Sequence, residues 1–355
     1  MITFSLGICG TVLRFGVGFA LSLLVAGIIA ANTLRFDSEV HPLFGGVPKA
    51  GQIAWNHLEG DGEGHWTSNG VRRASLPVES DGPPILLVGN SFTEGQQVTD
   101  EEHYGHLLER ELRLKGKYIP VLSFGKSGCS VPDYVASAKN LQAVFKPRWT
   151  VIQVQAGDFL GGSWREASPG SARFVRGDGQ SRIKVVVQPL PKKKQKFLLR
   201  QLAERFPHVV PFSLTYRRVR EFQRWLKNER PWFRTEPAKA AASDPLRSWG
   251  ADYPLGDEMR LLAEAYQGRL TLLFLAPFDP KDPSGQTEQE RLLQKLATAN
   301  GVRFVTLRDK FQDMEKIGKS PYGFNNTLFN YGHWNRYGHA AAAQLLLTDL
   351  RNTGL

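Results

Sequence analysis

The chain has 355 residues, of which 41% are hydrophobic and 22% are charged, and its formal net charge is +11. This composition is that of a globular protein, and it argues against a disordered chain. The two cysteines, Cys9 and Cys129, are too few and too far apart to indicate a disulfide framework.

Residues 1–35 predict a membrane anchor. From Phe15 to Ala31 the sequence runs for 17 residues without a charge, and Arg14 stands just before this run. A spanning helix needs about 20 apolar residues, and an arginine at its end can reach the interface. Small residues near the end of the run also fit the alternative, a cleaved signal peptide. With a retained anchor, we expect the body on the periplasmic, extracytoplasmic side.

The rest of the chain alternates between short apolar runs and amphipathic segments. Residues 36–83 come first and predict an extended connector, because they are rich in glycine, proline and polar residues and have no sustained period. The predicted strands are 85–89, 118–123, 149–155, 270–276 and 302–307, and the predicted helices are 100–115, 132–145, 257–267, 287–300 and 338–351. This alternation predicts an α/β domain with a parallel sheet, built from residues 84–160 and 256–355.

Residues 161–255 interrupt this domain and predict a helical, basic insertion. Between Lys192 and Arg234 there are 13 Lys and Arg residues against three Glu, an excess of +10 that carries nearly all of the net charge. Aromatic residues are interleaved with these cations, a composition that suits nucleic acid, an acidic glycan or an anionic lipid surface. An extracytoplasmic body meets glycans and lipids, so nucleic acid is not expected. A solvated helical cap without a ligand is the alternative.

A serine follows the first predicted strand of the sheet, and a histidine precedes the last helix. Ser91 lies in the segment GNSFTEG, residues 89–95, on a strand-to-helix turn that exposes its hydroxyl and its backbone N–H. His333 lies in the segment NYGHWN, residues 330–335. In parallel sheets, chemistry gathers at the carboxyl ends of the strands. We therefore expect the two side chains within about 3–5 Å, with His333 as general base toward Ser91.

These segments resemble the sequence blocks of the SGNH (GDSL-type) hydrolase superfamily. The first block is similar to residues 89–91, the second to residues 123–128, the third to residues 155–158 and the last to residues 330–333. The resemblance covers residues 84–160 and 256–352. It implies a flavodoxin-like three-layer sandwich with a parallel sheet, and it implies neither a cofactor nor a metal.

Carried over residue by residue, the resemblance implies that Ser91 is the nucleophile and His333 the base. The backbone N–H groups of Ser91 and Gly128 would belong to an oxyanion hole. Gly157 stands where the family has an asparagine donor, and Asn330 stands where it has the triad aspartate. Loss of one oxyanion donor costs about 10²–10³ in rate, and an aspartate-to-asparagine change in a triad costs about 10⁴. The resemblance therefore supports the fold more firmly than an efficient esterase.

Other groups could compensate for these two departures. Asp158 could turn toward His333, or the hydroxyl of Ser123 or Ser127 could donate a hydrogen bond. All three lie in or beside the second and third blocks.

Two functions fit this sequence. The first is a membrane-anchored acyl-ester hydrolase or O-acyltransferase that acts on a cell-envelope glycan, with the stretch 192–234 holding an acidic substrate or anionic lipid. The second is a catalytically silent accessory or scaffold subunit of a membrane protein complex. Asn330 and Gly157 favour the second function, whereas the presence of Ser91, Gly128 and His333 favours the first.

Overall fold

The computed structural model describes most of the α/β body and parts of the remaining chain. The described residues are 15–22, 24–25, 34–35, 38–41, 43–48, 50, 53–57, 59–73, 82–159, 172–176, 183–187, 254–267, 269–276, 286–327 and 332–352.

The chain divides into two compact units. One comprises residues 1–35 and 191–242, and the other comprises residues 36–190 and 243–355. In the first unit residues 15–22 and 24–25 are helical, and β1 is Leu34–Arg35. Within the described part of the chain, no helix combines the length and the hydropathy that a membrane crossing requires. The predicted anchor falls mainly on residues outside the described ranges and stays a prediction, as does the basic stretch 192–234.

A five-stranded parallel sheet forms the centre of the second unit. Its strands are β6 (Ile85–Gly89), β7 (Val121–Gly125), β8 (Trp149–Val154), β11 (Leu270–Phe274) and β12 (Arg303–Thr306). Their order across the sheet is β12-β11-β8-β6-β7, and every neighbouring pair is parallel. Numbered along the chain, this is the flavodoxin-like order 2-1-3-4-5, whose crevice opens between the first and third strands. The prediction of a parallel α/β sheet is confirmed.

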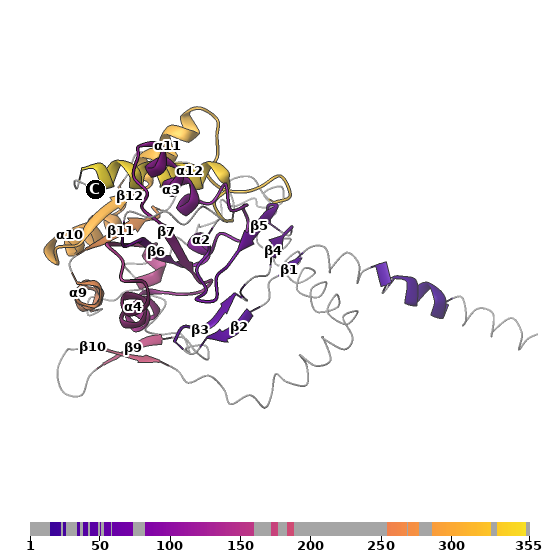
Figure 1. Ribbon diagram of the computed structural model, residues 1–355, viewed down its shortest axis with the longest axis horizontal. Coiled ribbons are helices and arrows are strands. Elements are labelled where there is room, and N and C mark those ends of the chain that lie inside the picture. The colour runs from indigo at the N-terminus through magenta and orange to yellow at the C-terminus, as the bar shows by residue number, and fades with distance from the viewer. Residues whose placement is uncertain are drawn as a thin grey trace, which may run out of the picture. The chain divides into compact units, whose positions relative to one another are not determined.

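Helices cover both faces of this sheet and make it the middle of three layers (Figure 1). On one face lie α4 (Val131–Phe145), α9 (Leu255–Tyr266) and α10 (Glu288–Ala299), whose apolar sides join one core cluster. On the other lie α3 (Tyr104–Leu114), α11 (Arg308–Lys316) and α12 (Arg336–Arg351), which form the second cluster. Strands β6, β8 and β11 are buried along their whole length. Such strands need apolar residues on both faces, which is why they appear in the sequence as continuous apolar runs.

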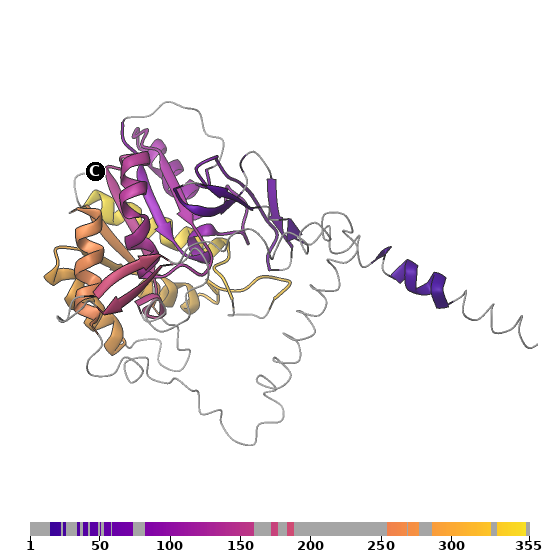
Figure 2. The same cartoon turned by 90° about the horizontal axis from the view of Figure 1, so that it is seen from below.

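Residues 36–83 form more regular structure than the expected extended connector. They contain β2 (Ser38–His41), β3 (Gly45–Pro48), β4 (Ile53–Asn56) and β5 (Gly62–His65), with β2 antiparallel to β3 and β4 antiparallel to β5. Figure 2 shows these short strands beside the main sheet. Phe44, Val47 and Val71 pack into the core cluster of α4 and α9. Each strand has four residues, and β3 and β5 contain two glycines each, so the strands carry little period-2 signal.

The described part of residues 161–255 differs from the expected helical insertion. It contains an antiparallel hairpin of β9 (Ala172–Arg176) and β10 (Ile183–Val187). Phe174 and Ile183 are buried in the core cluster of α4 and α9, so the hairpin belongs to the body. Basic and aromatic counts gave no information on this hairpin, because they describe the later stretch 192–234.

Helix α11 had no counterpart among the predicted elements. Its sequence is almost entirely polar, and Phe311 is its one buried residue. A single apolar anchor gives no helical period to detect.

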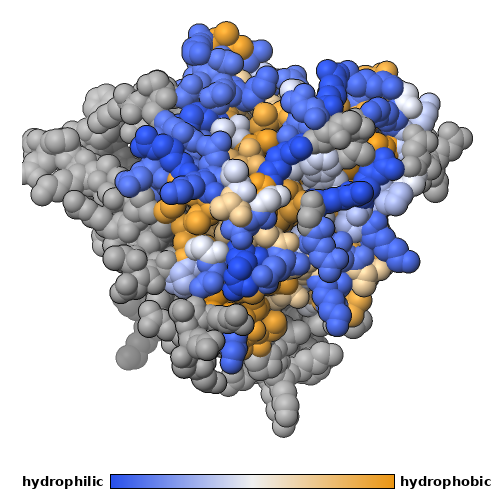
Figure 3. Space-filling model, turned by 90° about the vertical axis from the view of Figure 1, so that its left-hand side faces the viewer, coloured by the Kyte–Doolittle hydropathy of each residue, from blue (hydrophilic) through white to orange (hydrophobic). Residues whose placement is uncertain are grey.

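On the face that carries α9 and α10, hydrophilic and hydrophobic side chains are intermixed (Figure 3), as expected of the outer sides of amphipathic helices.

Candidate active site

The turn after β6 presents Ser91 at the carboxyl edge of the sheet. Ser91 begins the short helix α2 (Ser91–Glu94), and the side chain of Asn90 caps it by accepting a hydrogen bond from the Phe92 N–H at 3.1 Å. A Cβ at Gly89 would lie 2.1 Å from Thr93 Oγ1, so the strand must end in glycine for the helix to turn back this tightly. The turn therefore exposes the Ser91 hydroxyl at the crevice beside β6.

His333, which lies 242 residues later in the sequence, contacts this hydroxyl. Its Nε2 lies 2.9 Å from Ser91 Oγ, at the short end of the separation expected from the sequence. The Phe92 ring packs on the imidazole with ring centroids 5.1 Å apart. The next residue, Trp334, is fully buried in the core. Asn335 caps α12 by accepting hydrogen bonds from its first N–H groups. These contacts fix the histidine just before α12.

A carboxylate from the residues before the sheet completes the chain of contacts. Glu59 Oε2 lies 2.8 Å from His333 Nδ1, and Glu59 Oε1 accepts the His333 backbone N–H at 2.7 Å. A carboxylate only accepts, so the ring proton lies on Nδ1 and the Nε2 lone pair faces the serine O–H. Burial raises the pKa of Glu59, but its bonds to His333 outweigh this and hold the pKa below its ordinary value. Ser91, His333 and Glu59 thus have the geometry of a catalytic triad.

Close backbone contacts place Glu59 against the histidine. The Glu59 N–H donates to Asn56 Oδ1 at 3.2 Å, and the Gly60 N–H donates to Asn326 Oδ1 at 2.9 Å. A Cβ at Gly62 would lie 2.0 Å from the Gln96 carbonyl oxygen, and one at Gly332 would lie 2.3 Å from Glu59 Oε1. Glycine at these two positions lets the acid approach the histidine.

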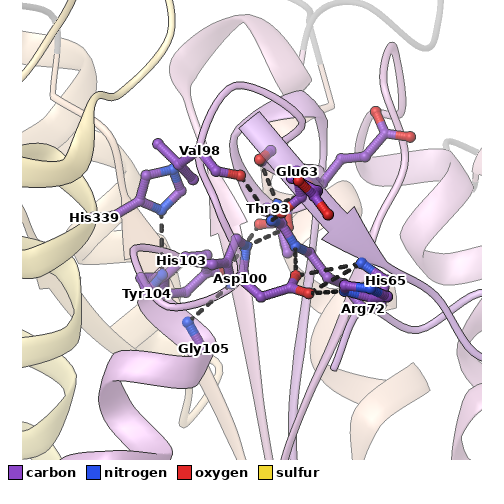
Figure 4. A network of polar contacts seen from close by, with 12 residues as sticks. Glu63, His65, Arg72, Thr93, Val98, Asp100, His103, Tyr104, Gly105 and His339 are labelled. Carbon is purple, nitrogen blue, oxygen red and sulfur yellow. Dashed lines mark hydrogen bonds and ion pairs between the residues drawn. The ribbon is translucent and has the colours of Figure 1, made fainter. Parts of the chain in front are cut away.

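A buried arginine joins the segment that carries Glu59 to the segment that carries Ser91 (Figure 4). Arg72 Nε donates to Asp100 Oδ1 at 2.6 Å, and the other guanidinium nitrogens donate to four backbone carbonyls. Those carbonyls belong to Glu63, Glu94, Gly95 and Val98. All five donors of the planar guanidinium are therefore used, which gives the buried cation both a counter-charge and a fixed orientation.

A buried histidine close to Arg72 secures the same helix. His103 Nε2 donates to the Thr93 carbonyl oxygen at 2.9 Å, and its Nδ1 accepts the Gly105 N–H at 3.1 Å. Burial lowers the pKa of His103 well below its ordinary value, so the ring is neutral and one nitrogen can accept. His103 and Arg72 together fix the C-terminal end of α2 (Figure 4).

Two backbone N–H groups near Ser91 remain available for an oxyanion. Within the described residues, neither the Ser91 nor the Gly128 N–H has a hydrogen-bond acceptor. Gly128 has a φ of +80° and open space where a Cβ would be. Gly157 is exposed, and a Cβ at this position would meet no atom within 4 Å. This position therefore has no side chain that could donate a hydrogen bond to an oxyanion. The described residues thus offer two oxyanion donors rather than three.

The groups expected to compensate have other partners. Asp158 accepts hydrogen bonds from Asn90 Nδ2 at 3.1 Å and from the Gln155 N–H at 2.9 Å. Burial raises the pKa of Asp158 to about 7. The Ser127 hydroxyl donates to Glu94, and Ser123 is buried inside β7. None of them contacts His333.

Sequence reasoning missed Glu59. Asn330, placed at the acid position by the resemblance, lies outside the described residues, and the carboxylate that contacts His333 is Glu59 instead. The one signal was local: Glu59 stands at the start of the segment EGDGEG, residues 59–64, in which alternate glycines indicate close backbone approach. Without a known partner, that signal could not identify the histidine.

No family model and no curated protein sequence matches this chain. Solved structures do. One is a catalytic mutant of an acetylxylan esterase from Geobacillus stearothermophilus, 15% identical, covering 78% of this chain and 96% of its own, with a TM-score of 0.40. A second is a psychrotrophic esterase from Pseudoalteromonas sp., 10% identical, covering 77% of this chain and 98% of its own, with a TM-score of 0.39. A third is a lipase/acylhydrolase from Enterococcus faecalis, 12% identical, covering 77% of this chain and 97% of its own, with a TM-score of 0.39. At these identities and TM-scores their activities do not transfer, so the chemistry is inferred from this chain's own residues.

Replacing Gly332 by alanine should break the contact between Glu59 and His333. The added Cβ would collide with Glu59 Oε1, whereas at Gly116, which also has a positive φ, a Cβ meets no atom within 4 Å. Both variants should lose about 1 kcal/mol of stability through backbone strain. NMR of ¹⁵N-labelled histidine should show loss of the Nδ1–H hydrogen bond in Gly332→Ala alone. An unchanged His333 signal would contradict this account of the glycine.

Asp158 should make stability fall between about pH 4 and pH 7. Its folded pKa of about 7 lies above its ordinary value of 3.8, so in this window the folded chain keeps a proton that the unfolded chain has lost. This contribution is complete at low pH and disappears as pH rises through the folded pKa, roughly 1–4 kcal/mol in all. Urea unfolding should therefore show a flatter pH dependence for Asp158→Asn.

Asp313→Asn serves as the matched control, because Asp313 is exposed and has a lowered pKa. Asp313 titrates below about pH 4, so in this variant the free energy of unfolding should change with pH as in the wild type. Parallel curves for the wild type and both variants would show that Asp158 does not titrate there.

Proposed function

We propose that the chain is a serine-dependent acyl-ester enzyme of the SGNH type, with Ser91 as nucleophile, His333 as general base and Glu59 as the triad acid. The observation that carries the proposal is the continuous contact from Ser91 Oγ to His333 Nε2 at 2.9 Å and from His333 Nδ1 to Glu59 Oε2 at 2.8 Å. A serine hydroxyl with an aligned, carboxylate-oriented imidazole is the arrangement that activates this weak nucleophile.

The geometry supports a two-step acyl transfer. Ser91 Oγ attacks the ester carbonyl carbon while its proton passes to His333 Nε2, and the Ser91 and Gly128 N–H groups receive the negative charge on the carbonyl oxygen. Collapse of this intermediate expels the alcohol, which takes the proton from His333. Water or an acceptor hydroxyl then attacks the acyl-serine by the same route. Release of the acid or of a new ester restores Ser91.

The vacant place at Gly157 favours the alternative, a catalytically silent scaffold subunit in a membrane complex. The other reason for that alternative was an asparagine in place of the triad acid, and Glu59 supplies the missing carboxylate. One absent donor costs about 10²–10³ in rate, which slows an enzyme of this kind without abolishing its chemistry. Two donors beside an aligned triad therefore support the enzyme over the scaffold.

Labelling by a fluorophosphonate tests the triad. The probe should modify Ser91, with no labelling in Ser91→Ala and strongly reduced labelling in His333→Ala. Glu59→Gln should lower the labelling rate by about 10²–10⁴, because the amide cannot offset the imidazolium charge. Asn330→Asp should gain nothing, since Ser91 and Glu59 already occupy both ring nitrogens of His333.

Glu63→Gln is the control, because Glu63 lies in the same segment with an exposed side chain and contributes only its carbonyl to Arg72. This variant should label at the wild-type rate. Absence of labelling in the wild type would support the scaffold instead. Normal labelling of Glu59→Gln, with a gain in Asn330→Asp, would assign the acid to position 330.

The proposal extends to place and substrate. The uncharged run from Phe15 to Ala31 would tether the enzyme to a membrane, with the body on the periplasmic side, and a cell-envelope glycan would supply or receive the acyl group. The excess of +10 between Lys192 and Arg234 would attract an acidic glycan or anionic headgroups by charge.

Fractionation tests the tether. The full chain should sediment with membranes and resist extraction by alkaline carbonate, because a spanning helix leaves lipid only with detergent. A chain lacking residues 1–35 should stay in the soluble fraction. Carbonate-soluble full chain, or membrane retention of the shortened chain at high salt, would contradict an anchor in residues 1–35.

A further inference from the structure

A second buried carboxylate lies beside the proposed nucleophile, and the triad does not use it. Glu94 ends the four-residue helix that Ser91 begins, and it is only 4% exposed. Its Oε2 accepts the Ser127 backbone N–H at 3.1 Å and also the Ser127 hydroxyl. Burying an ionisable group is costly unless it gains such bonds, so this carboxylate and residue 127 are strongly coupled.

The turn of residues 126–128 is attached to the nucleophile segment at three points. A Cβ at Gly125 would lie 1.9 Å from the Glu94 backbone nitrogen, so the end of β7 lies directly on the backbone of α2. The Lys126 N–H donates to the Gly89 carbonyl oxygen at 3.0 Å, at the end of β6. The third attachment is the pair of bonds from Ser127 to Glu94. It is the one that acts on the residue next to Gly128.

Gly128 is the residue of this turn whose position matters for an oxyanion. Its N–H has no acceptor within the described part of the chain, and its φ of +80° is a conformation that side chains other than glycine rarely adopt. An oxyanion donor must stand about 3 Å from the developing charge, so a small rotation of the turn would remove its benefit. The Cys129 N–H closes the turn by donating to the Lys126 carbonyl oxygen at 3.2 Å, and the bonds to Glu94 tie residue 127, which directly precedes this donor, to the nucleophile helix.

We propose that Glu94 is a positioning residue that fixes the Gly128 N–H relative to Ser91 by holding Ser127. The inference rests on the proposed acyl-ester chemistry and adds to it a device that aligns nucleophile and oxyanion donor through one short helix. Because Ser91 and Glu94 belong to the same four residues, a shift of the nucleophile carries the oxyanion turn with it.

The contact does not require a charge. A neutral Glu94 can still accept both the Ser127 N–H and the Ser127 hydroxyl at its carbonyl oxygen. Burial raises the pKa of Glu94, and the two Ser127 bonds work in the opposite direction. Both Ser127 groups donate to the same oxygen, Oε2, and the glutamine amide oxygen in that place can accept both. Glu94→Gln is therefore a conservative variant that keeps the turn in place, whereas Glu94→Ala releases it.

The test is steady-state hydrolysis of p-nitrophenyl acetate by the full chain. Glu94→Ala should lower kcat by about 10²-fold, the loss of one oxyanion donor, with KM changed by less than about threefold. Glu94→Gln should keep kcat within about tenfold of the wild type. The midpoint of the pH–kcat profile should move only slightly, because the contacts among Ser91, His333 and Glu59 are kept and the electrostatic interaction of Glu94 with His333 is minor. Amide exchange at residues 126–128 should speed up in Glu94→Ala only.

Glu109 provides the matched control. It is 2% exposed and accepts the Val121 backbone N–H at 2.9 Å, so it holds the start of β7 as Glu94 holds the residues after its end. Glu109→Ala should lose comparable stability and keep the wild-type kcat. A Glu94→Ala variant that keeps its kcat, or one that merely shifts the pH profile, overturns the positioning role alone. Absence of Ser91-dependent turnover in the wild type overturns the proposed function together with it.

Discussion

The carboxylate of Glu59 holds His333 by two bonds at once, one to the ring and one to the backbone N–H of the same residue. The pair joins positions 274 residues apart, and Ser91 depends on it for a correctly oriented imidazole. The proposed site therefore exists only when residues 53–73 dock on the sheet. The Arg72 guanidinium makes this docking specific, because it bonds both to the Glu63 carbonyl and to the end of α2.

Glycines, which have no side chain, allow these segments to approach each other closely. A Cβ at Gly62, Gly125 or Gly332 would lie 1.9–2.3 Å from an atom of a neighbouring segment. At Gly62 and Gly125 backbone packs directly on backbone, and at Gly332 backbone packs on the Glu59 carboxylate, so polar groups from three segments lie close together. The cost is entropic, since glycine loses the most freedom on folding, and the buried hydrogen bonds around Arg72 offset part of it.

Three carboxylates near Ser91 titrate differently because their surroundings differ. Burial acts on all of them, but Glu59 faces a histidine and has a lowered pKa. Asp158 and Glu94 face neutral donors, which do not overcome burial, and their pKa values are raised. The ionised acid thus stands where it can offset an imidazolium, while the other two hold backbone and side-chain amides in place. The different roles of these carboxylates therefore follow from their hydrogen-bond partners and not from their residue type.

The sequence by itself determined the α/β sheet, because buried parallel strands must be continuous apolar runs, and it placed Ser91, Gly128 and His333 in blocks that follow strands or precede a helix. Local pattern could not reveal α11, which has one buried residue, or the small strands before the sheet, which have four residues each. It also could not choose the acid. Glu59 and His333 share no periodicity or block, and their meeting depends on docking across the whole fold. Tertiary structure alone decided which carboxylate faces the histidine, and which buried glutamate holds the turn beside it.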